Sequence, residues 1–327
     1  MSSTTKYIVG RLLQVLPTAF IIVLFTFALL QIAPGDMVDV IAGESGSATP
    51  EYMAELRAAY GLDVPPYMQF WHYIQNILHL DLGYSFRENM PISQVILERL
   101  PATLLLSVTA ILFALVVGVI LGVLAAKYRG SVLDTTISII STIGFATPLF
   151  WIGLMLIVLF SIQLRWLPVA GMTTVGTSYT GQFDYALDVA RHLALPALSL
   201  GFFYLSMYVR ITRSAMLEIY SLDFVRTARA KGLSEWRVVV RHILRNALLP
   251  VVTITGLELG GLFGGTVVIE TVFSWPGIGR LAYDAVFSRD LNLLLGIFLC
   301  SALLVILMNL IVDMLYAVLD PRIEVAG

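Results

Sequence analysis

One stretch of the sequence combines positive charge with small side chains, as a protein-docking element would need. It reads Arg226-Thr227-Ala228-Arg229-Ala230-Lys231-Gly232-Leu233. Residues 223–230 favour a helix, and Gly232 is a suitable helix stop. Ser234 can cap a second helix. Two short helices joined at Gly232 would form a compact knob able to fill a groove on another protein. A basic loop held against anionic lipid headgroups would have the same composition.

Glu258 is a carboxylate within a glycine-rich apolar stretch. A charged group inside a membrane-spanning helix is costly, so it usually faces the protein interior or a water-filled cavity. Glu258 shares a helix face with Gly261 and Gly265, whose default role is close helix packing. Two interpretations stay open: Glu258 lines a transport pathway, or it pairs within the helix bundle. Ser141 and Thr142 are further pathway candidates, although such hydroxyls can bond to their own helix backbone.

The motifs of several enzyme classes are missing from the sequence. There is no G-x-x-x-x-G-K-[ST], H-E-x-x-H or G-x-S-x-G. The stretch 277–282 matches G-x-G-x-x-A, but it follows Trp275-Pro276 in a predicted loop rather than a strand, so we predict no nucleotide site. Four histidines without ligand spacing and one cysteine, Cys300, argue against a metal site and a disulfide framework. We expect no catalytic residues and no cofactor bound by this chain.

The composition identifies the elements that must position these residues. Of 327 residues, 58% are hydrophobic and 13% are charged, and the mean hydropathy is +0.86. Apolar runs long enough to cross a bilayer as helices lie at about 8–32, 102–126, 135–162, 193–213, 249–272 and 293–319. These runs do not alternate in polarity as the strands of a transmembrane β-barrel would. Only helices then keep the backbone hydrogen-bonded in lipid, so we predict an all-α polytopic membrane protein with six transmembrane helices.

The distribution of basic residues predicts the orientation of these spans. The two ends and the segments 127–134 and 210–248 carry thirteen Lys and Arg residues, and the opposite segments carry seven. Segment 33–101 holds nine acidic and three basic residues. Both termini are therefore expected to be cytoplasmic, with segment 33–101 facing outward.

These assignments predict three regions of the chain. Residues 1–32 form a cytoplasmic N-terminus and first span, residues 33–101 a periplasmic helical cap, and residues 102–327 a five-span core with a cytoplasmic loop at 214–248. Within the cap, Thr49-Pro50-Glu51 predicts a helix over 50–60, and apolar spacing predicts another over 67–80. The cap either rests on the membrane surface or serves as a docking platform for an external partner.

The chain resembles the permeases of binding-protein-dependent ABC importers, specifically their dipeptide/oligopeptide/nickel branch. The basic run at 226–233, followed by Arg245-Asn246-Ala247, is similar to the cytoplasmic coupling loop of that family. Further matching stretches are Pro34-Gly35-Asp36, Asp81-Leu82-Gly83-Tyr84-Ser85, Trp166-Leu167-Pro168, Leu195-Pro196, Val209-Arg210-Ile211-Thr212-Arg213-Ser214, Glu270-Thr271-Val272-Phe273, Trp275-Pro276-Gly277, Val312-Asp313, Leu315-Tyr316 and Asp320-Pro321. The loop departs from the wider superfamily motif, because Arg226, Thr227 and Ala228 replace its Glu-Ala-Ala.

The resemblance implies a type I ABC importer permease fold in the bacterial inner membrane. It implies that the loop inserts into a cleft on a cytoplasmic ATPase, and that two such ATPases use the ATP and Mg²⁺. It also implies a second homologous permease and a periplasmic solute-binding protein as partners, and no nucleic acid. The cargo would be dipeptides, oligopeptides or a similar small solute.

Two other classes stay open on the residues alone. An ion-coupled secondary transporter would contain intramembrane titratable groups, as Glu258 and Asp313 would be, but we find no internal repeat. A structural subunit of another membrane complex would explain the glycine packing but not the basic knob.

Overall fold

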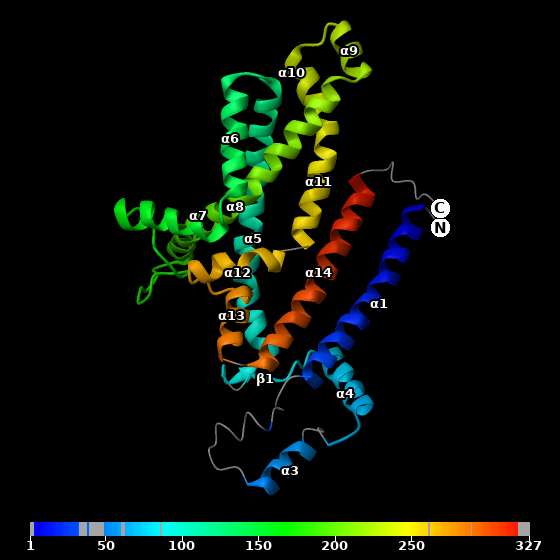
Figure 1. Cartoon of the computed structure of the whole chain (residues 1–327), viewed down its shortest axis with the longest axis vertical. Coiled ribbons are helices and arrows are strands. Elements are labelled where there is room, and N and C mark those ends of the chain that lie inside the picture. The colour runs from blue at the N-terminus through cyan, green and yellow to red at the C-terminus, as the bar shows by residue number, and fades with distance from the viewer. Residues whose placement is uncertain are drawn as a thin grey trace. The chain divides into compact units, whose positions relative to one another are not determined.

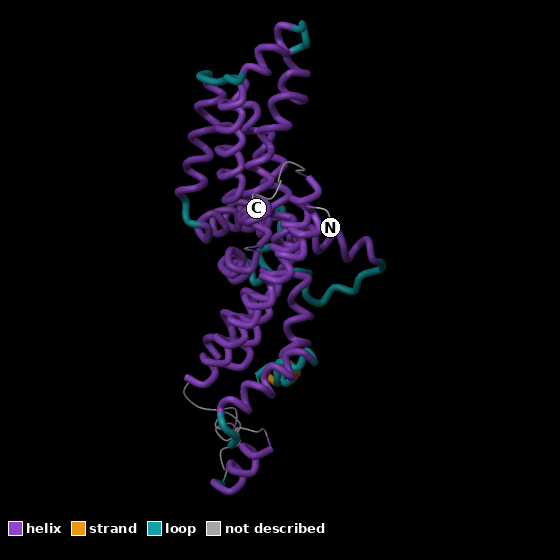
Figure 2. The backbone as a smooth tube through the Cα atoms, turned by 90° about the vertical axis from the view of Figure 1, so that its right-hand side faces the viewer, coloured by secondary structure: helices purple, strands orange, loops and turns teal. Residues whose placement is uncertain are grey.

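The protein is almost entirely helical within the part of the chain that the structure describes. This structure is a computed structural model, and it describes residues 3–32, 38, 49–59, 63–85, 87–260, 262–288 and 290–319. Figure 2 shows one short pair of strands among the helices. The chain forms two compact units, one comprising residues 1–101 and 281–327, the other residues 102–280. This grouping reflects packing, whereas the predicted division at 32 and 101 reflects membrane topology and stays a prediction.

The first unit is built around two long apolar helices, α1 (Ser3–Ile32) and α14 (Leu291–Leu319). They pack side by side and run in opposite directions (Figure 1). The described ends of the chain therefore lie at the same end of this pair, as a topology with both termini on one membrane side requires. The unit also contains α3 (Pro50–Ala59), α4 (Pro66–Leu78), β1 (Tyr84–Ser85) and β2 (Met90–Pro91).

The two helices predicted between residues 50 and 80 are present as α3 and α4. Thr49 Oγ1 accepts a hydrogen bond from the backbone N–H of Tyr52 at 3.3 Å, as the N-cap signal predicts. Helix α4 rests against α1 through Phe70, whose ring centroid lies 5.1 Å from that of Phe27. Tyr67 and Trp71 of the same helix are exposed. Residue 60, the last residue of the first predicted helix, lies outside the described residues.

The second unit packs four long helical segments side by side (Figure 1). They are α5 (Ile92–Lys127), which enters from the first unit, α6 (Val132–Ala146), α8 (Gln182–Tyr220) and α11 (Arg245–Gly260). Helices α5 and α8 approach closely because two glycines face α8. A Cβ at Gly118 would lie 2.6 Å from Tyr208 Cβ, and one at Gly122 would lie 2.6 Å from Thr212 Cβ. Small residues at four-residue spacing permit this contact.

Two predicted spans are broken. The run 135–162 divides into α6 and the segment α7 (Leu149–Leu156) with η1 (Ile157–Gln163), which are bent by 106°. Pro148 lacks a backbone N–H and forces Thr147 into an extended conformation, so the helix stops there. The run 249–272 likewise divides into α11 and α12 (Leu262–Val272). Gly260 ends α11, and glycine is a poor helix former.

The span count of six stays a prediction. Within the described residues, four helices are long and apolar enough to cross a membrane, or five if the bent pair is one span, while the apolar part of α1 covers Leu13–Leu29. Helix α8 continues unbroken past Pro196 to Tyr220. Arg210 and Arg213 are therefore helical, and the first part of the predicted loop 214–248, up to Tyr220, also belongs to α8.

Candidate functional site

The predicted knob forms in the structure, between α8 and α11. Helix α9 (Asp223–Ala230) is followed by a tight turn in which Gly232 N–H donates to Arg229 O at 2.9 Å. Gly232 has φ of +75°, a left-handed conformation that glycine adopts without strain. The prediction that Gly232 stops this helix is confirmed.

The second knob helix differs from its prediction. Helix α10 (Glu235–Arg237) runs directly into the π-helical turn η2 (Val238–Leu244) and then into α11. The Ser234 side chain makes no capping hydrogen bond, so its predicted cap is wrong. The backbone carbonyl of Ser234 accepts from Val238 N–H instead, at 3.0 Å. The knob therefore comprises α9, the Gly232 turn and the first turns of one long helical run.

A hydrophobic cluster seats the knob on the ends of the long helices. Val225 and Ala228 are the buried side chains of α9. They belong to a cluster with Ala126 of α5, Met216 of α8, and Val238, Val239, Ile243 and Ala247 of the second helical run. Because the members come from α5, α8 and η2, the knob cannot shift without disturbing the packing of all three.

The eight residues predicted to dock a partner fall into two groups. Six are exposed: Arg226, Thr227, Arg229, Ala230, Lys231 and Gly232. Ala228 is buried in the cluster, and Leu233 is half-buried against it. Ala228 and Leu233 thus position the knob, while the other six form its outer surface.

Two knob cations are paired within the chain: Arg226 Nη1 lies 3.6 Å from Asp223 Oδ1 on the exposed surface, and Arg229 is held more tightly. The Arg229 guanidinium donates two hydrogen bonds to the Glu235 carboxylate, from Nε at 3.1 Å and from Nη2 at 2.7 Å. It also lies 5.6 Å from the centre of the Tyr220 ring. The hydrogen bonds to Glu235 raise the pKa of Arg229 above its usual value. Arg229 therefore braces the two sides of the Gly232 turn, and Lys231 remains exposed at its tip.

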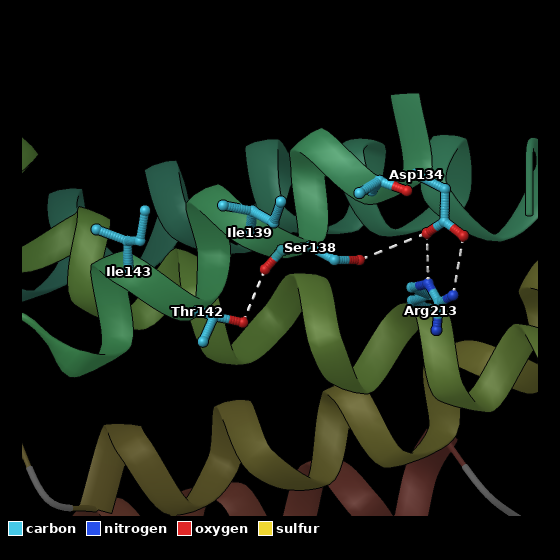
Figure 3. Close-up of a pocket in the computed structure, with 7 residues that line it drawn as sticks. Asp134, Ser138, Ile139, Thr142, Ile143 and Arg213 are labelled. Carbon is cyan, nitrogen blue, oxygen red and sulfur yellow. Dashed lines mark hydrogen bonds and ion pairs between the residues drawn. The ribbon is translucent and has the colours of Figure 1, made fainter. Parts of the chain in front are cut away.

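A groove lined by both polar and apolar side chains lies between α6 and α8 (Figure 3). At one end of the groove is an ion pair in which Arg213 Nε donates to Asp134 Oδ1 at 2.7 Å and Arg213 Nη2 donates to Asp134 Oδ2 at 2.9 Å. Gly130 N–H also donates to Asp134, at 2.9 Å. Asp134 is buried, and this fork joins the start of α6 to α8. No local pattern in the sequence indicates this pair, because its members are 79 residues apart.

The two hydroxyl candidates differ in their surroundings. Two adjoining hollows of about 430 and 250 Å³ share Ser138, Thr142 and Arg213 in their lining. Ser141 is buried and lines the smaller hollow. Thr142 lines both, and its hydroxyl donates to Ser138 O of its own helix at 2.8 Å. Both residues therefore face this groove, and a pathway role for them stays a prediction.

Glu258 lies near the end of α11, away from the groove. Its side chain is half-buried and contributes to neither hollow. The buried Tyr204 of α8 lies close enough to interact electrostatically with it. Glu258 was expected to share a helix face with Gly261 and Gly265. The surroundings of these two residues lie outside what the structure describes. Its role in a pathway stays a prediction.

A second buried carboxylate, Glu270 of α12, escaped the sequence analysis as a site residue. Thr103 Oγ1 donates to Glu270 Oε1 at 2.7 Å, and Arg280 N–H donates to Oε2 at 2.9 Å. Thr103 Oγ1 in turn accepts from Ile278 N–H at 2.8 Å. Glu270 thus caps the start of α13 (Ile278–Ser288). The sequence feature that could have indicated Glu270 is the stretch 270–273, which is similar to the permease family.

This cap explains the G-x-G-x-x-A pattern. A Cβ at Gly277 would lie 2.3 Å from the Glu270 carboxyl group, and one at Gly279 would lie 2.9 Å from Oε2. The two glycines therefore make room for a carboxylate of the same chain, so the pattern is accounted for without a nucleotide.

Comparison with known proteins identifies the family. The model described as "Binding-protein-dependent transport system inner membrane component" matches residues 118–325. The model for the N-terminal part of such membrane components matches residues 4–107. The chain therefore belongs to the family of inner-membrane components of binding-protein-dependent transport systems. Its expected roles as a transport component rather than an enzyme, and as a multi-pass inner-membrane protein, are confirmed.

Curated relatives align along nearly the whole chain. The dipeptide transport system permease protein DppB of Escherichia coli (strain K12) is 43% identical over 335 residues, covering 98% of each chain. The di/tripeptide transport system permease protein DppB of Pseudomonas aeruginosa (strain UCBPP-PA14) is 44% identical over 332 residues, again covering 98% of each.

A solved structure shares the fold. A chain of the inward-facing MetNI methionine ABC transporter superposes with a TM-score of 0.55 at 19% identity, covering 69% of this chain and 97% of that chain. The predicted all-α fold of the ABC importer permease type is confirmed.

Proposed function

We propose that this chain is one permease subunit of an ATP-driven importer that carries dipeptides or short oligopeptides across the inner membrane. The observation that carries the proposal is the end-to-end similarity to dipeptide permeases, at 43% identity over 98% of both chains. The seated knob and the groove between α6 and α8 provide the two elements that such a subunit needs. The knob is a rigid external contact, and the groove places polar side chains among the apolar ones of two long helices.

The proposed assembly has four kinds of partner. A second, homologous permease completes the pathway. The spans of one chain are too few to enclose a solute pathway by themselves. Two cytoplasmic ATPases bind and hydrolyse the ATP with Mg²⁺, and this chain binds no cofactor itself. A periplasmic solute-binding protein delivers the peptide, and the lipid bilayer surrounds the spans.

The knob is the proposed contact with an ATPase. Its outer surface carries Arg226 and Lys231 on a frame fixed by the hydrophobic cluster and the Arg229–Glu235 pair. Cations on a compact knob can pair with acidic groups that rim a groove. ATP-dependent closure of the ATPases would then bias the helices between two rigid arrangements.

The segment 33–101 is the proposed contact for the binding protein. Helices α3 and α4 belong to the acidic segment 33–101, and α4 exposes Tyr67 and Trp71. Exposed aromatic side chains are common at protein interfaces. This assignment places residues 33–101 in the periplasm and both termini in the cytoplasm.

The first experiment is purification of the tagged chain from native membranes in mild detergent, with mass spectrometry of the proteins that accompany it. We expect a second polytopic permease and one or two ATPases with Walker motifs. Reconstituted with its binding protein, this assembly should take up labelled dipeptide into proteoliposomes only when ATP is enclosed with the ATPases. Recovery of the chain alone, under conditions that preserve a known ABC importer, would contradict the proposal.

A further inference from the structure

The groove between α6 and α8 holds a cation whose role the fold leaves open. Arg210 lines the smaller hollow and lies within the apolar run 193–213. Its neighbour Arg213, one helical turn away, is neutralised by Asp134. Among the described residues, no carboxylate lies within ion-pair distance of Arg210.

The contact that Arg210 does make leaves its hydrogen-bond donors available. Its guanidinium lies 4.7 Å from the centre of the Phe145 ring, which attracts a cation through its face. A contact with the face of an aromatic ring uses none of the guanidinium N–H donors. The side chain is exposed to the hollow. A cation in an apolar helix is costly unless water or an anion reaches it.

The hydroxyl groups around Arg210 face the groove mainly as acceptors. Thr142 Oγ1 donates its proton to Ser138 O at 2.8 Å, and Ser206 Oγ donates to Phe202 O at 3.2 Å. Ser138 Oγ is directed at Asp134 Oδ1, at 3.4 Å. The remaining lone pairs of these oxygens are free to accept hydrogen bonds from a ligand. The groove therefore offers one unpaired cation beside a row of acceptors.

That pattern matches the features that all linear peptides share. Every unmodified peptide carries a terminal carboxylate and several N–H donors, whatever its side chains. A guanidinium binds a carboxylate through two parallel hydrogen bonds, and hydroxyl oxygens accept from amide or ammonium N–H groups. A permease for peptides of varied sequence needs contacts of this general kind.

We propose that Arg210 binds the C-terminal carboxylate of a transported peptide as the peptide passes through this permease. The oxygens of Ser138, Thr142 and Ser206 accept hydrogen bonds from its N–H groups. This inference rests on the function proposed above. It assigns to the α6–α8 groove a part of the solute pathway, and it gives Arg210 and Arg213 different tasks: Arg210 binds cargo, and Arg213 holds the helices together.

The test compares a dipeptide with its C-terminally amidated form in proteoliposomes containing the whole transporter and its binding protein. The wild-type assembly is compared with Arg210→Met and with the charge-conserving Arg210→Lys. Arg129→Met is the matched control, since Arg129 is an exposed cation in the turn before α6. The readout is the ratio of free-acid to amide uptake. The binding protein is identical in every assembly, so a change in this ratio between variants reports the permease.

We expect the ratio to fall by about tenfold or more in Arg210→Met, because a hydrogen bond to a charged group is lost. Amide uptake should stay within about twofold of wild type, and Arg129→Met should leave the ratio unchanged. Equal losses for both peptides would mean that Arg210 pairs with another subunit or a lipid headgroup, and would overturn the proposal. An unchanged ratio would also overturn it. Failure of the wild-type assembly to import any peptide would instead contradict the function proposed above.

Discussion

The seating of the knob leads to a prediction whose size follows from the structure. Val238 is 0% exposed and belongs to the cluster that joins α9 to η2. Replacing it by alanine removes two methyl groups, which costs about 1.6 kcal/mol of transfer free energy. A cavity that the surrounding helices fill only in part adds a further ~1 kcal/mol. Val240, two residues later in the same element, is 39% exposed, so its replacement by alanine should cost about 0.5 kcal/mol.

The two variants should separate in hydrogen exchange and in coupling. A loss of about 2.6 kcal/mol corresponds to opening of α9 about 70-fold more often. Amides of residues 227–232 should therefore exchange about 70-fold faster in Val238→Ala and only about twofold faster in Val240→Ala. In proteoliposomes, Val238→Ala should import fewer peptides per ATP hydrolysed, whereas Val240→Ala should match wild type. Equal exchange in both variants would refute the packing argument. Faster exchange in Val238→Ala with an unchanged peptide-to-ATP ratio would refute the role of the seated knob in coupling.

Three further substitutions test other parts of the molecule. The assembly with Gly232→Asp should hydrolyse ATP without importing peptide. An acidic side chain would enter the knob surface, and a non-glycine residue at φ +75° is strained by about 1–2 kcal/mol. The control Gly176→Asp is also at positive φ with open space around it, and it should transport normally. Gly277→Ala should lower the melting temperature and yield of the purified assembly, since its Cβ would lie 2.3 Å from Glu270. Gly181→Ala has open space and should match wild type, so equal melting temperatures would contradict the account of the cap. Glu258→Gln should assemble normally and change the rate of peptide uptake; a wild-type rate would exclude Glu258 from the pathway.

Local signals in the sequence predicted local structure well. Gly232 ends α9 because left-handed backbone is strained for other residues, and Thr49-Pro50 begins α3 for equally local reasons. The apolar runs located nearly all of the long helices. Where a run was interrupted, however, composition could not distinguish one span from two. Pro148 accounts for the end of α6, but the angle of 106° depends on what packs around it.

The candidate site was predictable only where its residues are adjacent in the chain. The knob is one continuous segment, so its surface residues could be named, yet the burial of Ala228 depends on a cluster from three other elements. The Asp134–Arg213 pair joins residues 79 apart and had no local pattern. Glu270 had a recognisable motif, but the reason for the following glycines became clear only when they were found around its carboxylate.

The continuity of the helices on either side of the knob has a mechanical consequence. Helix α8 has 39 residues and the run from Glu235 to Leu259 has 25, so they are rods about 58 and 37 Å long. The knob links one end of each rod. This link is not a flexible loop, because the hydrophobic cluster and the Arg229–Glu235 pair fix the knob to both helical segments. The two helical segments should therefore tilt together about their contacts. We therefore expect a displacement at the knob to reach the far ends of both helices, tens of ångströms away.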